Sequence, residues 1–379
     1  MSRLLFRPEG YEGSVEPHLP KVQNAIMKAL TQAQKGFSHD TLRLDRPSLK
    51  ALAVMLVEFA EDLHCEIGIW HSLERYNTEF FGTQLPFLSE QRPLFPQDAI
   101  SPSRLQHLLW ILYPQLIPDL LLRPDHTDLV RLAQVAAEVL QEQFADLPKD
   151  SGVKQFLGTP NKHGWEVKRK LVWLGTRSYL FRIFCDRYIE EQNAKFSDIG
   201  VIDDFLCQQC TEWAGLGPLE VLASVLDLPS ERRAALFSWS ERHNAMFKVL
   251  SGNKEKIEVL NLINDVKYRV RLNLERSPFA RGQVVYGSLV PWDGEWYWSG
   301  EQKLFDRLDA AAIEQVKQHY RKLPTIYYRY SPEDLKKARE MVRRQYEEFV
   351  ASHGKDWVVY PDGLTMAADW QNSAKAKIA

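Results

Sequence analysis

Hydrophobic positions at helical spacing run through the first two-thirds of the chain. Val22, Ile26 and Leu30 recur every four residues, and similar spacing continues in later segments. Positions three or four apart share one face of a helix, so this periodicity predicts amphipathic helices. We therefore expect residues 1–18 to be an extended lead-in and residues 19–250 to form an all-helical domain.

Two segments of this region need separate interpretation. Residues 105–122 are about as long as a membrane span, but Pro114, Pro118 and several polar side chains interrupt them. That pattern favours a buried pair of helices broken by proline. Residues 217–250 have the pattern of two helices joined near Pro229, which indicates an αα-hairpin packed in the core.

The hydrophobic period then changes from helical to alternating. Alternation begins at Ile257, and a second alternating run follows the turn signal Asn264-Asp265. Residues 284–300 supply two more runs around the turn sequence Pro-Trp-Asp-Gly. A period of two is typical of strands with one buried face. Four short strands predict a small antiparallel sheet or barrel over residues 254–302.

Helical spacing returns in the C-terminal region, and residues 332–353 carry clear signals of one helix. Ser331 can cap this helix and Gly354 can end it. We expect residues 303–379 to form C-terminal helices with a short strand near residues 357–360 and a frayed tail. The predicted fold class is α+β, mainly α: a large multi-helix domain, a small antiparallel β-barrel-like module and a C-terminal helical extension.

Length, composition and charge are those of a globular protein with more than one domain. The chain has 379 residues, of which 45% are hydrophobic, and its eleven tryptophans imply large buried surfaces. The net charge of −2 creates no overall attraction for nucleic acid or for an anionic membrane. The N-terminus lacks the apolar core of a signal peptide. We therefore expect a cytoplasmic protein without membrane association.

Local catalytic and cofactor-binding signatures are absent from the sequence. It contains no G-x-S-x-G, no G-x-x-x-x-G-K-[ST], no H-E-x-x-H and no G-x-G-x-x-G. We therefore expect no cofactor and favour a protein without enzymatic activity. A catalytic site built from dispersed residues stays open, because such a site leaves no local pattern.

Cys207 and Cys210 form a C-x-x-C pair within a helical run, where a spacing of three puts both thiols on one face. Free cysteines are commonly buried as small hydrophobic residues, and we favour packing for this pair. Zinc binding and redox activity are the alternatives. A zinc site would need two further ligands, and a redox pair would need a strand-to-helix setting that the pattern lacks.

Glu61, His64 and His71 are the densest group of candidate metal ligands. Glu61 and His64 form an E-x-x-H pair on a helix, as in di-iron bundles. Such a centre needs a second E-x-x-H on another helix, which the sequence lacks. A metal-dependent enzyme centred on these residues is therefore our third functional hypothesis, and a solvated acidic stripe is the simpler interpretation.

Two basic segments with interleaved aromatic residues, 161–187 and 321–344, support a second hypothesis, that the protein binds nucleic acid. Cations beside aromatic rings are the combination that single-strand binding uses. The simpler interpretation is that these cations line the solvent face of helices. The candidate nucleic-acid-binding residues are Lys168, Arg169, Lys170, Arg177, Lys336, Lys337, Arg343 and Arg344.

An aromatic cluster supports the first hypothesis, a non-catalytic interaction or regulatory protein. In a strand, Trp296 and Trp298 share one face and Tyr297 points to the other. We expect the two tryptophans to enter the core of the β module, and Tyr297 and Trp292 to stay at its rim. The candidate residues for binding a protein or peptide partner are Trp292, Trp296, Tyr297 and Trp298, carried by a helical scaffold.

Overall fold

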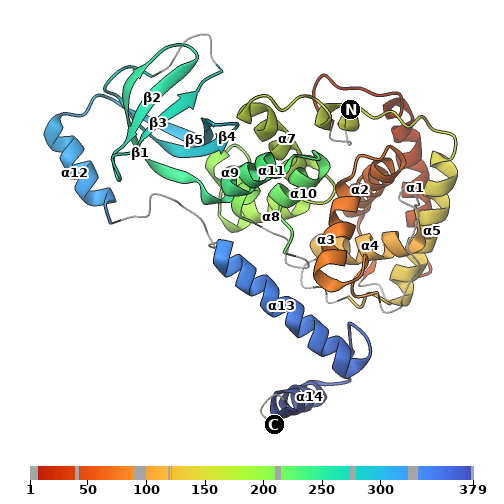
Figure 1. The fold of residues 1–379 in the computed structure, drawn as a ribbon. Coiled ribbons are helices and arrows are strands. Elements are labelled where there is room, and N and C mark those ends of the chain that lie inside the picture. Colours follow the sequence, from red (N-terminus) through yellow and green to blue (C-terminus); the bar gives the residue numbers. More distant parts are fainter. Residues whose placement is uncertain are drawn as a thin grey trace.

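The computed structural model describes residues 7–38, 42–88, 100–117, 120, 122–209, 215–273, 279–322 and 332–376. Its helices and strands form one helical part, one sheet beside it, and two helices that extend away from the helical part (Figure 1). The predicted α+β, mainly α, fold class is confirmed.

The helical part begins with α1 (Leu19–Gln34), α2 (Arg46–His64), α3 (Ile69–Phe81), α4 (Pro102–Leu116) and α5 (Thr127–Phe144). It continues with α6 (Gly152–Leu157), α7 (Gly164–Arg177), α8 (Arg182–Glu191), α9 (Ile199–Gln208), α10 (Pro218–Val225) and α11 (Ser230–Phe237). Short 3-10 segments lie at Glu16–His18 and Ser238–Glu241. One continuous hydrophobic core joins these helices and extends to Val290, Trp292 and Tyr297 of the sheet.

Side-chain caps fix where several helices begin. The Asp45 carboxylate accepts a hydrogen bond from the amide of Ser48 at 2.9 Å, at the start of α2. The Ser101 hydroxyl accepts one from the amide of Arg104 at 3.3 Å, at the start of α4. Each cap satisfies a backbone donor that the first helical turn leaves without a partner.

The predicted break at Pro114 is wrong, because α4 continues through that residue to Leu116. Pro114 lies two residues from the end of the helix, so its missing amide interrupts only the last turn. Pro118 lies outside the described residues. Among the helices that the structure describes, none is both long enough and apolar enough to cross a bilayer.

The predicted αα-hairpin is present as α10 and α11, joined near Pro229, but its second helix ends at Phe237. The predicted continuation to residue 250 is wrong, because β1 (His243–Gly252) is a strand. Ala245, Phe247 and Val249 point into the sheet's core, while Met246 contributes to a separate cluster on the outer face. The apolar positions fit both a helical and an alternating period. Pairing with two neighbouring strands decides between them, so the all-helical region ends before residue 243 rather than at 250.

The sheet consists of β1, β2 (Lys256–Asn261), β3 (Lys267–Arg271), β4 (Val284–Trp292) and β5 (Glu295–Phe305). Its hydrogen-bonded order is closed, β1-β2-β3-β5-β4, with β4 pairing back to β1. Neighbours are antiparallel except at β3 and β5, where Val270 pairs with Trp296 in parallel. The predicted turn between β4 and β5 is confirmed, with Asp293 and Gly294 at φ 51° and 75°.

The C-terminal region contains α12 (Ala310–Tyr320), α13 (Pro332–His353) and α14 (Gly363–Ala376). Ile313, Val316 and Tyr320 of α12 pack on the outer face of the sheet. The helix predicted over residues 332–353 is confirmed, whereas its predicted cap, Ser331, lies outside the described residues. The predicted strand is wrong, and the residues predicted as a frayed tail are helical as far as Ala376, where the described residues end. Residues 357–360 form no strand, and Asp362 accepts a hydrogen bond from the Thr365 amide at 2.7 Å, which starts α14.

Candidate functional site

The aromatic residues predicted at the rim of the β module are buried against the helical part. The Trp292 side chain is fully buried, and its indole nitrogen donates to the carbonyl of Asn161 at 3.1 Å. Its ring meets Trp239 edge to face, with centroids 6.2 Å apart. Tyr297 lies so close to Gly164 that a Cβ atom there would be 2.7 Å from the tyrosine ring. The predicted rim position of both residues is therefore wrong.

Trp296 and Trp298 lie on the opposite face of β5, as the alternation predicted. Both pack, partly buried, against the core of the sheet. Trp296 makes edge-to-face contacts with Tyr268 and His243, at centroid distances of 4.9 Å and 4.8 Å. These aromatic residues fill the sheet interior, so none of the four predicted partner-binding residues forms an exposed aromatic platform.

A buried ion cluster joins the helical part to the sheet. Asp203 of α9 accepts hydrogen bonds from Arg242 at 2.7 Å and from Ser299 of β5 at 2.9 Å, and it pairs with Lys168 of α7. Burial alone would raise the pKa of Asp203, but the two cations outweigh this effect and hold the pKa below its usual range. The Lys168 ammonium therefore pairs with Asp203 inside the protein.

Cys207 also borders this cluster, with its sulfur 3.5 Å from the Lys168 Nζ. The thiol is buried in α9, as expected for a packed cysteine, and burial raises its pKa to about 11. A thiol with so high a pKa stays protonated at neutral pH, which makes it a poor nucleophile. Cys210 lies outside the described residues.

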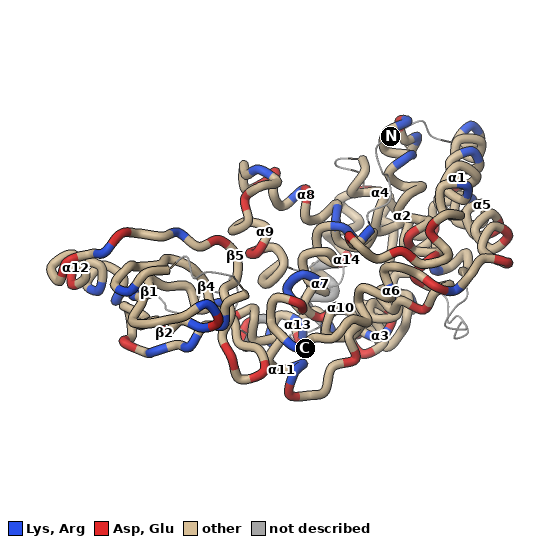
Figure 2. Tube along the Cα trace, turned by 90° about the horizontal axis from the view of Figure 1, so that it is seen from above, with Lys and Arg blue, Asp and Glu red and all other residues tan. Residues whose placement is uncertain are grey.

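The other predicted cations of residues 161–187 are divided between internal contacts and the surface. Arg169 lies over the rings of Tyr11 and Phe156, and Lys170 donates to the carbonyl of Thr159 and to Asn161. Burial lowers the pKa of Lys170 to about 8. Arg177 is exposed. These positions do not combine into one cationic face, and both signs of charge are interspersed along the chain (Figure 2).

The predicted cations of the C-terminal segment are at the surface. Lys336, Lys337, Arg343 and Arg344 are all exposed along α13. Lys336 and Arg343 also line the large cleft between α3, α10, α11 and α13 that is described below.

The predicted metal ligands have separate partners. Glu61 receives a hydrogen bond from Arg7 at 2.8 Å and another from Ser151 at 2.7 Å. His64 Nε2 lies 3.0 Å from the Leu147 carbonyl oxygen, and His71 pairs with Glu74. Across the described residues, no three His, Cys, Asp or Glu side chains converge as metal ligands would. The structure thus does not bring Glu61, His64 and His71 together.

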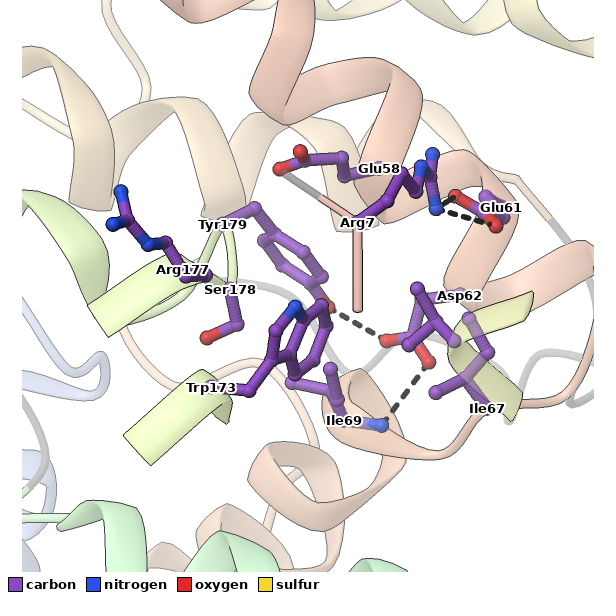
Figure 3. Close-up of a pocket in the computed structure, with 11 residues that line it drawn as sticks. Arg7, Glu58, Glu61, Asp62, Ile67, Ile69, Trp173, Arg177, Ser178 and Tyr179 are labelled. Carbon is purple, nitrogen blue, oxygen red and sulfur yellow. Dashed lines mark hydrogen bonds and ion pairs between the residues drawn. The ribbon is translucent and has the colours of Figure 1, made fainter. Parts of the chain in front are cut away.

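A small cavity lies beside Asp62, lined by residues of α2, α3, the end of α7 and the segment that follows it (Figure 3). Asp62 accepts hydrogen bonds from the amides of Ile69 and Trp70 and from the hydroxyl of Tyr179. Burial raises the pKa of Asp62. The cavity measures about 20 Å³, which is room for about one water molecule and too little for a substrate.

A much larger cleft of about 660 Å³ lies between α3, α10, α11 and α13. Its aromatic side includes Tyr76 and Phe80, whose rings stack at 5.6 Å, and Phe237, which is 41% exposed. The cationic residues that line the cleft are Arg75, Arg233, Lys336, Arg339 and Arg343, and the acidic ones are Glu79, Glu220 and Glu340. The lining therefore carries more positive than negative charge, whereas the whole chain is slightly negative.

Contacts at two points hold α13 as one wall of this cleft. Arg339 donates to Glu220 at 2.8 Å and to the Gly215 carbonyl at 3.1 Å, and its guanidinium lies over Tyr76. Further along the helix, the Tyr346 ring meets Phe81 edge to face at 5.0 Å. Hence α13 forms a defined wall rather than a detached arm.

Comparison with known proteins assigns no activity. Residues 22–200 match the model of a family described as a protein of unknown function (DUF3843). The match covers α1 to α8 and ends before most of α9, the sheet and α13. No curated protein and no solved structure matches the chain.

Sequence reasoning singled out Lys336 and Arg343 but not the cleft. Arg75 was missed because it is the one lysine or arginine of α3, and Arg233 was missed because α11 has only Arg232 beside it, too few cations to stand out as a basic segment. The single local signal is a cationic stripe on α13, at positions 336, 339 and 343.

Proposed function

We propose that this chain is a non-catalytic interaction protein whose partner binds in the cleft between α3, α10, α11 and α13. The observation that carries the proposal is the cleft itself, a cavity of about 660 Å³ that combines a cationic lining with aromatic rings. Binding pockets in proteins have volumes in this range and orient their ligands with a few polar groups. The aromatic residues of the β module contribute to the core instead.

The lining favours binding over catalysis. The described lining of the cleft contains no histidine, cysteine or aspartate, and of its three glutamates Glu220 pairs with Arg339 and Glu340 with Lys336, so these two carboxylates already have cationic partners. The Ser72 hydroxyl donates to the Gly68 carbonyl, its oxygen lies 2.8 Å from the Ser224 hydroxyl, and Arg75 donates to Ser224, so these contacts of the two serines include no carboxylate or imidazole. A serine without an adjacent base is a weak nucleophile.

A peptide suits the lining better than a nucleic acid does. Glu79, Glu220 and Glu340 are interleaved with the cations, and they would repel a chain that carries a phosphate at every unit. A protein segment can place its own charges where the cations are. Lys168 and Lys170, which a nucleic-acid interface would need, are held in internal contacts.

Selection from a random peptide phage library on the full chain tests this proposal. The binding of enriched peptides is then measured with the variant Glu340→Cys, which carries a bulky maleimide label that obstructs the cleft. Gln345→Cys, on the same helix but outside the lining, carries the same label as the matched control, and wild-type protein treated with the reagent controls for natural cysteines.

We expect the label at position 340 to abolish binding and the label at 345 to leave it intact. Failure of any peptide to enrich, or equal binding by both labelled variants, would contradict the proposal.

A further inference from the structure

We infer that the occupant of the cleft is a short acidic segment of a partner protein, with one large apolar side chain among its carboxylates. This inference rests on the proposed function and adds the chemistry of the ligand. It follows from the position of three exposed cations around an aromatic surface.

The two long walls of the cleft are single faces of helices. On α13 the lining residues lie at positions 336, 339, 340 and 343, and on α3 they lie at 72, 75, 76, 79 and 80. At 1.5 Å per residue these faces are about 10–12 Å long. An extended chain rises about 3.3 Å per residue, so about four residues of a ligand can lie between the walls.

Three of the cations on these walls, Lys336, Arg343 and Arg75, are exposed, whereas Arg339 is bound to Glu220 and Gly215. Lys336 pairs with Glu340 at 4.0 Å and Arg343 with Glu347 at 3.2 Å, and both pairs are exposed contacts within one helix. On α3, exposed Arg75 contacts the Ser224 hydroxyl. Exposed pairs of this kind contribute little to stability, so carboxylates of a ligand can replace them without disturbing the fold.

Arginine favours carboxylates in particular. Its planar guanidinium can donate two parallel hydrogen bonds to one carboxylate, and Arg75 and Arg343 line the cleft from two different helices, α3 and α13. A segment between the walls can therefore direct acidic side chains to both sides, because successive side chains of an extended chain point in opposite directions.

The aromatic surface supplies the apolar contact. Tyr76 and Phe80 stack on each other, and Phe237, which is 41% exposed, lines the same cleft from α11. A large apolar side chain placed among the acidic ones would cover these rings and remove apolar area from water. Desolvated apolar anchors surrounded by polar contacts are the usual centre of a protein interface.

Fluorescence anisotropy with a defined probe tests the inference. The probe is a fluorescein-labelled peptide, Gly-Glu-Glu-Trp-Glu-Glu-Gly, titrated with the full chain. Matched peptides replace every Glu by Gln, every Glu by Lys, or Trp by Gly, and a labelled single-stranded oligothymidylate serves as the nucleic-acid probe.

We expect the Glu peptide to bind, the Gln and Gly versions to bind at least about 5-fold more weakly, and added salt to weaken binding. The double variant Arg75→Glu/Arg343→Glu should lose the Glu peptide and gain the Lys peptide. Lys303→Glu, an exposed change on β5 outside the cleft, should bind like wild type. Lys336→Glu provides a single exposed change if the double variant does not fold.

The outcomes separate the two proposals. If library peptides bind in a manner that the label at 340 blocks, but are neutral or basic, the inference about an acidic ligand is wrong and the proposed function stands. If no peptide binds in the cleft, both fail. Tighter binding of oligothymidylate than of the Glu peptide would overturn the inference in favour of a nucleic-acid ligand.

Discussion

Replacing Asp203 by asparagine is expected to destabilise the attachment of the sheet to the helical part by about 3 kcal/mol. The amide would keep the size of the side chain but remove the charge that pairs with Lys168 and Arg242. Breaking a buried ion pair from one side costs about 3–5 kcal/mol, because the remaining charge stays buried without compensation. We take the lower end because Arg242 also reaches Asp204 at 3.5 Å.

Urea unfolding followed by tryptophan fluorescence measures this loss. Trp239 and Trp292 are buried where the sheet meets the helical part, so detachment would expose them to water and change their share of the emission of the eleven tryptophans. Far-UV circular dichroism, recorded in parallel, reports the helices. A separate, earlier fluorescence transition in Asp203→Asn would mean that the sheet detaches before the helices unfold.

Asp265→Asn is the matched control. Asp265 pairs with Lys317 at the surface, where its side chain is 53% exposed, so its loss should cost less than about 1 kcal/mol. If Asp203→Asn is no less stable than Asp265→Asn, the ion cluster does not hold the sheet in place and the reasoning from burial fails.

Two further predictions concern the core. Gly164→Ala should lower the free energy of unfolding in urea by about 1–3 kcal/mol, because the new Cβ would lie 2.7 Å from the Tyr297 ring. Gly363→Ala, where the Cβ would have no atom within 4 Å, should lower it much less. Equal effects of the two substitutions would show that Tyr297 moves aside without cost. Burial lowers the pKa of His107 to about 4 from 6.5, so the folded state binds fewer protons than the unfolded state and stability falls as pH drops below about 6.5. Between pH 7 and pH 5 this loss should approach about 2 kcal/mol, and His107→Phe should remove it; an unchanged slope in the variant would assign the effect to other groups.

The sequence predicted elements whose signals are local. The turn at Asp293-Gly294 and the helix over residues 332–353 both carry their own turn or cap residues, and both are present. Strand β1 was mistaken for a helix because its apolar residues fit two periods. Ala245 and Val249 are four positions apart, as on one face of a helix, and Ala245, Phe247 and Val249 also alternate, as on one face of a strand. Only long-range pairing with β2 and β4 distinguishes the two, and pairing leaves no mark within the segment.

The candidate site could not be predicted in the same way. Strand alternation correctly separated Tyr297 from Trp296 and Trp298, but it could not tell that α7 would cover Tyr297, since the covering residue is Gly164. The cleft depends on four helices that meet only in three dimensions. Arg75 and Arg343 are 268 positions apart in the numbering, and nothing in either neighbourhood indicates the other.

Under the proposed function, residues on the α13 wall that contact the partner can change without loss of the contacts that hold the helix in place. Lys336 and Arg343 are exposed, and exchanging exposed residues usually changes stability by no more than about 0.5 kcal/mol. Selection can therefore alter the charge pattern of this wall while Tyr346 and Arg339 keep the helix in place. On the same proposal, substitutions on one face of a single helix would change which segment binds and leave the helical core unchanged.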